Sequence, residues 1–287
     1  MGKFFGAVGK AAWTGAFAVV LTAVTGAIWT ALLLANLKLS PAVPWAAGAM
    51  AAISLALWAW LGGAWAPKRT QTARRSYLRA GAIPARLFLT ALTAGVLCIV
   101  ALAGLWIVLF ELVKVPGNGA DFSKLPPATV AASLAMAALV GAVFEEAGFR
   151  GYFQGTLERY LPGPAAILVC AAVMAPEHAL TQGFVWPTML FYLLVDVMLG
   201  FSAYLTQSIL PGVAIHAIGL LTFFGIVWPG DRARTPIWQH GPDGWFWLHA
   251  GQAALFGALG LWLFVRLARM RRGPAVQHGS ARAALAH

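Results

Sequence analysis

The sequence predicts an all-α protein, a polytopic bundle of transmembrane helices, and three observations support this prediction. The chain has 287 residues, of which 60% are hydrophobic and only 10% are charged. Soluble globular domains have roughly 45–50% apolar and about 25% charged residues. The mean hydropathy is +0.76, and apolar stretches of membrane-spanning length recur along the whole chain. These features exclude a disordered chain and an ordinary soluble domain.

Eight apolar stretches are long enough to cross a bilayer, which takes ~20 residues per helix. The first is too long for the apolar region of a signal peptide, which has about 7–15 residues. We therefore predict about eight spans, at residues 11–37, 43–66, 87–113, 128–147, 164–183, 187–205, 207–228 and 244–266. We divide the chain into N-terminal helices with a basic loop, a central helical core, and a last helix with a basic tail, at residues 1–127, 128–228 and 229–287.

The positive charge predicts the orientation in the membrane. The chain has 20 Lys and Arg against nine Asp and Glu, a formal net charge of +11. With eight spans, fifteen basic residues, Arg150 among them, fall on the side of the N-terminus, and five fall on the other side: Lys38, Lys114, Lys124, Arg232 and Arg234. Positive loops face the cytoplasm, so both termini are predicted to be cytoplasmic in an integral protein of the bacterial inner membrane.

The basic residues also predict a partner. The loop at residues 67–86 and the tail at residues 266–287 are strongly basic and lie next to predicted spans. Such juxtamembrane segments attract anionic lipids. We expect contact with anionic lipids at these segments and no binding of nucleic acid.

Charged side chains inside the spans are candidates for function, because each costs at least ~2.5–3.5 kcal/mol at the centre of a span. The candidates are Glu145, Glu146, Glu177 and Asp196, together with the histidines His178 and His216. Adjacent residues on a helix point about 100° apart, whereas residues at i and i+4 share a face. Glu146 can therefore pair with Arg150, which leaves Glu145 as a candidate general base. The alternative is a salt-bridged helix end just outside the bilayer.

The spacing around the next turn predicts that Glu145 and His178 meet. If the fourth helix continues to about Tyr160, Glu145 stands 15 residues before the turn 161–164 and His178 stands 14 residues after it. At ~1.5 Å per residue both lie about 20 Å from the turn in an antiparallel hairpin. The alternative for each histidine is a hydrogen-bonded packing residue.

The order of these residues resembles a known family. Glu145-Glu146-x-x-x-Arg150, then His178 one helix later and His216 two helices after that, is similar to the CPBP family of CAAX proteases and bacteriocin-processing enzymes. These are intramembrane glutamic endopeptidases and include the Ras-converting-enzyme type. The resemblance covers residues 128–228, including Thr206-Gln207-Ser208-Ile209-Leu210 before the last histidine.

The resemblance implies an activity and a role for each residue. Glu145 would be the catalytic base and would activate a water with His178. Arg150 would hold Glu146 as structural support, and His216 would stabilise the oxyanion. The substrate would be a membrane-associated or small secreted protein or peptide, and no metal or other cofactor is implied.

Two positions depart from the family pattern. Met174 stands where the family has Phe, and Leu220 stands where it usually has Asn, four residues after His216. Asp196 is the nearest polar candidate to replace that Asn, and the alternative is a packing residue within the bundle.

Two rival functions remain open. One is a metal-dependent membrane protease with Glu145, Glu177, His178 and His216 as mixed ligands. The other is a non-proteolytic scaffold, immunity or transport protein on the same bundle.

Overall fold

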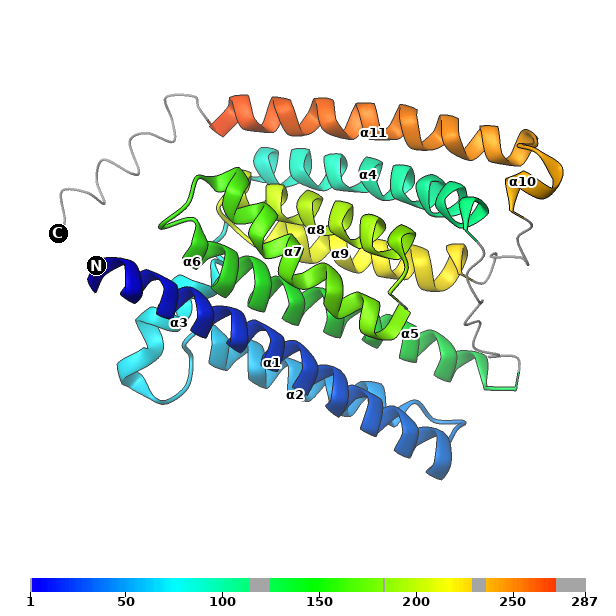
Figure 1. Ribbon diagram of the computed structural model, residues 1–287. Helices are drawn as coiled ribbons and strands as arrows, with labels where there is room; N and C mark the ends of the chain where they lie inside the picture. The colour runs from blue at the N-terminus through cyan, green and yellow to red at the C-terminus, as the bar shows by residue number, and fades with distance from the viewer. Residues whose placement is uncertain (1, 114–123, 183, 229–235, 272–287) are drawn as a thin grey trace.

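The computed structural model describes residues 2–113, 124–182, 184–228 and 236–271, and every regular element in these ranges is helical. Figure 1 shows the long helices side by side in one bundle. The α-helices are α1 (Gly2–Leu39), α2 (Trp45–Leu61), α3 (Gln71–Leu78), α4 (Ala85–Leu112), α5 (Pro127–Glu145), α6 (Gly155–Leu157), α7 (Gly163–Gln182), α8 (Trp186–Thr206), α9 (Leu210–Thr222), α10 (Ile237–His240) and α11 (Gly244–Arg271). A short 3-10 turn, η1 (Lys68–Thr70), and two π-helices, η2 (Glu146–Gln154) and η3 (Phe223–Val227), complete the set.

Each of the eight predicted spans corresponds to one helix, and the prediction of an all-α polytopic bundle is confirmed. Among the residues that the structure describes, six helices are long and apolar enough to cross a membrane: Phe5–Leu39, Ala85–Leu112, Pro127–Leu157, Trp186–Thr206, Leu210–Val227 and Gly244–Arg271. The other two, Trp45–Leu61 and Gly163–His178, are apolar but shorter. At ~1.5 Å per residue the 17 residues of α2 are a few ångströms shorter than the ~30 Å apolar layer of a bilayer.

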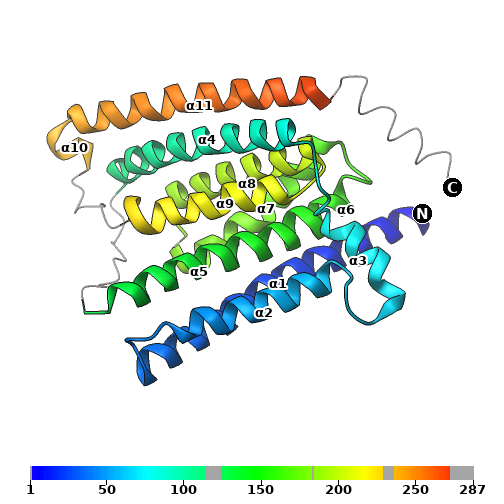
Figure 2. The same cartoon turned by 180° about the vertical axis from the view of Figure 1, so that it is seen from behind.

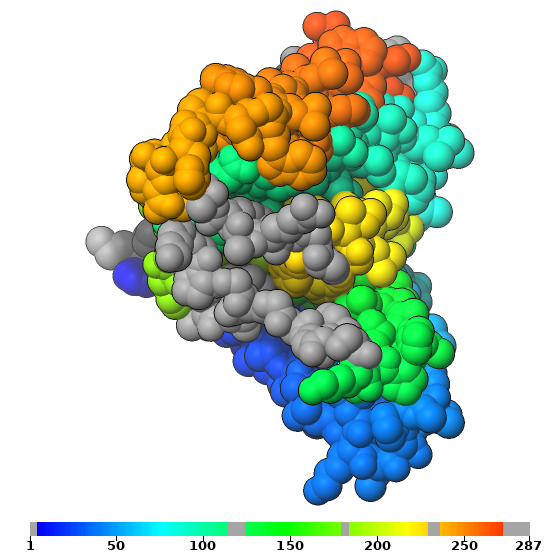
Figure 3. All heavy atoms as spheres, turned by 90° about the vertical axis from the view of Figure 1, so that its right-hand side faces the viewer, coloured from blue at the N-terminus to red at the C-terminus, as the bar shows by residue number. Residues whose placement is uncertain are grey.

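The helices form two outer groups around a central one. α11 packs on α4, and α4 packs on α8 and α9, while α1 packs on α2, α5 and η2. Figures 1 and 2 show α11 and α4 on one edge, α1 and α2 on the other, and α5, α7, α8 and α9 between them. Figure 3 shows the same order from one end of the bundle. The four central helices are therefore covered by other helices on two sides.

Basic residues gather at one end of the bundle. The start of α1, α3, the start of α4, the connection from α6 to α7 and the end of α11 meet there (Figure 1). We call this the basic end, since these elements, with η1 directly before α3, carry Lys10, Lys68, Arg69, Arg75, Arg86, Arg159, Arg269 and Arg271. Five predicted loop or tail charges lie outside the described residues: Lys114, Arg232, Arg234, Arg272 and Arg282.

Arg150 differs from the other basic residues of that side. It was counted with the charges that orient the chain, but its side chain is only 1% exposed. The reason is that the helix of α5 does not stop near residue 147, the predicted end of the span. It continues through η2 and α6 to Leu157, three residues short of the predicted Tyr160, and carries Arg150 within the bundle.

Candidate active site

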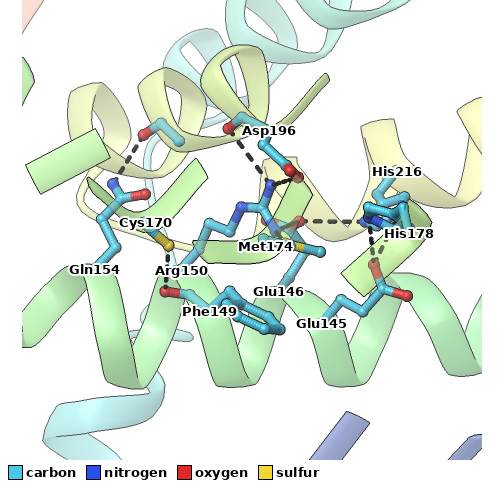
Figure 4. Close-up of polar contacts among 11 residues, drawn as sticks. Glu145, Glu146, Phe149, Arg150, Gln154, Cys170, Met174, His178, Asp196 and His216 are labelled. Atoms are coloured by element: carbon cyan, nitrogen blue, oxygen red, sulfur yellow. Dashed lines mark hydrogen bonds and ion pairs between the residues drawn. The ribbon is translucent and has the colours of Figure 1, made fainter. Parts of the chain in front are cut away.

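Glu145, His178 and His216 come together from three helices, α5, α7 and α9. The Oε2 atom of Glu145 lies 4.0 Å from Nε2 of His178 and 3.7 Å from Nε2 of His216. Figure 4 shows both imidazole rings on the same side of the Glu145 carboxylate. The side chains of Glu145 and His178 are 14% and 21% exposed, and that of His216 is 7% exposed. The site is therefore largely, but not completely, closed.

The hairpin formed by the long helix of α5, η2 and α6 and the antiparallel α7 explains this meeting. The chain turns between Leu157 and Gly163 and runs back, so residues equally far from the turn stand at the same height. This is the register that the spacing of Glu145 and His178 predicts. The ring of His178 is also stacked on Tyr192 of α8, with centroids 4.2 Å apart and planes 14° from parallel.

His216 contacts both glutamates. Its Nδ1 atom lies 3.2 Å from Oε1 of Glu146, while its Nε2 atom faces Glu145. This approach requires glycine one turn earlier in α9, because a Cβ atom on Gly212 would lie 2.5 Å from Oε2 of Glu146. The imidazole is thereby oriented by a buried carboxylate.

Glu146 is the first member of a chain of buried ion pairs that runs through Arg150 to Asp196 (Figure 4). Its Oε1 atom lies 3.6 Å from Nη1 of Arg150, and Nη2 of Arg150 lies 2.7 Å from Oδ1 of Asp196. Nη1 of Arg150 also contacts the sulfur of Met174. All three charged side chains are at most 1% exposed. Buried charges need partners of this kind, because an unpaired one costs several kcal/mol.

The π-helix η2 carries Glu146 and Arg150. π-Helical turns occur mostly as short insertions in α-helices, frequently at functional sites. Here the segment lies between α1 on one side and α7 and α8 on the other. The carbonyl oxygen of Phe149 in this segment accepts a hydrogen bond from the thiol of Cys170, at 3.4 Å.

Two predicted site residues stand apart from the group of Glu145 and the histidines. Asp196 pairs with Arg150, which agrees with its interpretation as a packing residue partnered within the bundle. Glu177, next to His178 in the chain, makes no ion pair with a described residue. Among the described residues, no three His, Cys, Asp or Glu side chains are grouped so as to hold a metal ion.

Leu220 occupies the position of the family asparagine. A Cβ atom on Gly141 would lie 3.0 Å from Cδ1 of Leu220 and 3.4 Å from Oε1 of Glu145. Leu220 therefore packs against α5 close to the Glu145 carboxylate. Where the family usually offers an amide, this chain has an apolar side chain.

Sequence reasoning missed Tyr192, Gly212 and the π-helix. Tyr192 lies four residues before Asp196 in the same apolar span, so a hydroxyl group on the helix face of a candidate acid was an available signal. Gly212 lies four residues before His216, and a small residue at that spacing could also have been noticed. No sequence signal marks the π-helix, because it depends on how the neighbouring helices pack.

Comparison with known proteins agrees with the motif. Residues 127–221 match the family model described as Rce1-like, type II CAAX prenyl endopeptidase. No curated protein and no solved structure gives a significant match. The family implies intramembrane protease activity of the CAAX type, and with the six long apolar helices it makes this an integral membrane protein. In the segment 127–221, about a third of the chain, the protein is thus similar to the CAAX proteases of the Rce1-like family.

Proposed function

We propose that the protein is a glutamic-type intramembrane endopeptidase with Glu145 as its catalytic base. One observation carries the proposal: a single carboxylate oxygen, Oε2 of Glu145, faces the Nε2 atoms of both His178 and His216 at 3.7–4.0 Å. These distances are longer than direct hydrogen bonds. A water molecule can therefore contact the carboxylate and an imidazole together.

Peptide hydrolysis needs a deprotonated water and a donor for the developing negative oxygen. In the proposed reaction Glu145 takes a proton from the water, and the resulting hydroxide attacks the peptide carbonyl carbon. His178 accepts a hydrogen bond from the same water or donates one to it, and so orients the water for attack. The C–N bond then breaks, and the proton held by Glu145 passes to the leaving amine.

His216 is the proposed oxyanion donor, and its contact with Glu146 sets a condition on its protons. A neutral imidazole has one N–H group. If the Nδ1–H group donates to Glu146, the Nε2 atom has no proton to offer. Donation to the oxyanion from Nε2 therefore requires either a ring that carries both protons or a protonated Glu146 that donates to Nδ1.

The test uses the full chain in liposomes of bacterial phospholipids, incubated with a set of membrane-anchored and small secreted peptides and examined by mass spectrometry. We expect cleavage by wild type and a loss of about 10²–10⁴-fold in Glu145→Gln and His178→Ala, since general base catalysis contributes about this much. Full cleavage by either variant contradicts the mechanism. Thermal melting of each variant separates a lost catalytic group from a lost fold.

A non-proteolytic scaffold, immunity or transport role is the second candidate, and Leu220 is the observation that favours it. The apolar side chain beside Glu145 offers no hydrogen bond to an oxyanion. If wild type cleaves no peptide but Leu220→Asn does, the chain carries the family's base without its second donor. Cleavage by wild type that is lost with a chelator would instead favour the metal-dependent protease.

The substrate in this proposal is a peptide or protein in or near the membrane. The site lies within the apolar helices, so the scissile bond must reach the bilayer or its interface. The bacterial inner membrane, with both termini in the cytoplasm, is the proposed location, because of the charge bias of the loops.

A further inference from the structure

A polar cavity of about 300 Å³ opens at the basic end of the bundle. It is lined by Ser76, Arg79, Gly155, Glu158, Arg159 and Gln207. These residues come from α3 and its end, from α6 and the turn after it, and from the turn between α8 and α9. None of them belongs to the candidate active site. The cavity therefore needs an explanation of its own.

Arg79 is fixed on one wall of this cavity. Its guanidinium lies 3.1 Å from Oε2 of Glu158 and donates to the carbonyl oxygens of Arg150 and Ala203, at 3.4 and 3.5 Å. Its backbone φ is 54°, a left-handed conformation that costs a non-glycine residue roughly 1–2 kcal/mol. Gly155 leaves room for the side chain, because a Cβ atom there would lie 2.9 Å from Cδ of Arg79.

The negative charge of Glu158 is compensated within the protein. One carboxylate oxygen faces Arg79, and the other accepts a hydrogen bond of 2.8 Å from the side-chain amide of Gln154. The acid is thus engaged on both oxygens. Glu158 therefore positions the side chain of Arg79. Among the residues that line the cavity, it does not compensate the charge of Arg159.

Arg159 is the available cation. Its side chain is exposed and lies over the ring of Tyr77, with Cζ 5.0 Å from the ring centroid, and it makes no ion pair with a described residue. The ring contact leaves the planar guanidinium with its N–H groups at the edge. The Ser76 hydroxyl and the second amide N–H of Gln207, whose Nε2 donates to Tyr204 at 2.7 Å, add neutral donors.

We propose that this cavity binds a phosphoryl group, supplied by the headgroup of a membrane phospholipid. A planar guanidinium binds phosphate through two parallel hydrogen bonds, and hydroxyl and amide donors complete the coordination of its oxygens. The charge bias of the loops also places the basic end at the cytoplasmic surface of the membrane. Phosphate groups are present there at all times, whereas a free carboxylate would have to arrive with a substrate.

The test measures lipid binding to the purified full chain by native mass spectrometry. Phosphatidylglycerol is compared with diacylglycerol of the same acyl chains, which has no phosphate, and sn-glycerol 3-phosphate serves as a soluble competitor. Arg159→Gln is compared with Arg69→Gln, an exposed basic residue of the same end that does not line the cavity. Loss of a charge-assisted hydrogen bond should weaken phosphatidylglycerol binding about tenfold in Arg159→Gln, and Arg69→Gln should bind as wild type does.

Competition by glycerol phosphate would assign the binding to the phosphoryl group alone. If the competitor has no effect while the difference between the two variants persists, the intact lipid is required. Either result supports the site. Equal weakening in both variants would mean diffuse surface attraction, and equal binding of diacylglycerol would mean acyl-chain binding, and each of these overturns the proposal. Should Arg159→Gln prove unstable, Ser76→Asp tests the same wall by placing a negative charge at an exposed side chain.

Discussion

Tyr192 acts on His178 through the flat stack between their rings. Aromatic pairs contribute roughly 0.5–1.5 kcal/mol beyond their burial. If the stack orients the imidazole towards Glu145, Tyr192→Leu should lower kcat by about two- to tenfold with little change in KM. Tyr192→Phe keeps the ring and should stay close to wild type. Equal kcat values for the two variants would show that His178 is held in place without the stack.

Asp196 keeps Arg150 paired deep in the bundle. Removing one partner of a buried ion pair typically costs about 3–5 kcal/mol, and without Asp196 the guanidinium of Arg150 would keep only one ion pair, its longer contact of 3.6 Å with Glu146. Asp196→Leu should therefore lower the free energy of unfolding by about this amount, measured by denaturant titration in mixed micelles. Glu177→Gln is the matched control, since Glu177 makes no ion pair with a described residue, and its unfolding free energy should change by less than about 1 kcal/mol. A similar loss in both variants would contradict the role given to Asp196.

At the level of single residues, the candidate group of Glu145, His178 and His216 was predictable from the sequence. The buried residues that support this group were predictable only in part. Charged side chains in apolar spans stand out, and helix rise places Glu145 and His178 at one height. The pair of Glu146 and Arg150 follows from their i, i+4 spacing. The double contact of His216 depends on how α9 approaches α5, which sequence spacing does not give. The sequence also left Asp196 open between two roles.

Among the elements, α4 and α11 pack through small residues. A Cβ atom on Gly104 of α4 would lie 2.7 Å from the backbone oxygen of His249 in α11, and backbone cannot move aside cheaply. A Cβ atom on Gly257 of α11 would meet Ala101 at an ordinary 3.8 Å. The two positions thus test close packing at a single interface.

Gly104→Ala should therefore be destabilising and Gly257→Ala should not. Overpacking typically costs about 1–3 kcal/mol, whereas alanine is about 1 kcal/mol more favourable than glycine within a helix. We expect a melting temperature several degrees lower for the first variant and equal or higher for the second, measured by circular dichroism in detergent. Identical melting curves would show that α11 shifts freely on α4.

Hydropathy predicted the helices better than their ends. Each apolar stretch became one helix, because burying backbone polar groups in a bilayer requires internal hydrogen bonding. The helix of α5 continues through η2 to Leu157, ten residues beyond the predicted end of the apolar span at 147 and three residues short of the helix end at Tyr160 that the hairpin spacing assumes. This extension mixes apolar residues with the polar side chains of Arg150 and Gln154, which are buried, so the burial of these two side chains follows from helix packing and not from composition.

For the whole molecule, the basic end predicts which side of the membrane each loop faces. Arg69 and Gln239 are both exposed, and they lie on η1 and on α10, at opposite ends of the bundle in Figure 1. Positive loops remain in the cytoplasm. We therefore expect Arg69 to face the cytoplasm and Gln239 to face the outer side.

Single cysteines at these two positions test this orientation. The two natural cysteines, Cys98 and Cys170, are first replaced by alanine, and Arg69→Cys or Gln239→Cys is then introduced. In intact bacterial cells a membrane-impermeant maleimide should label Gln239→Cys and leave Arg69→Cys unlabelled, and permeabilised cells should show both. The reverse pattern would invert the bundle and place the basic end outside. Labelling of both positions in intact cells would mean that both lie outside and that an even number of spans separates them. The charge bias would then reflect lipid contact alone.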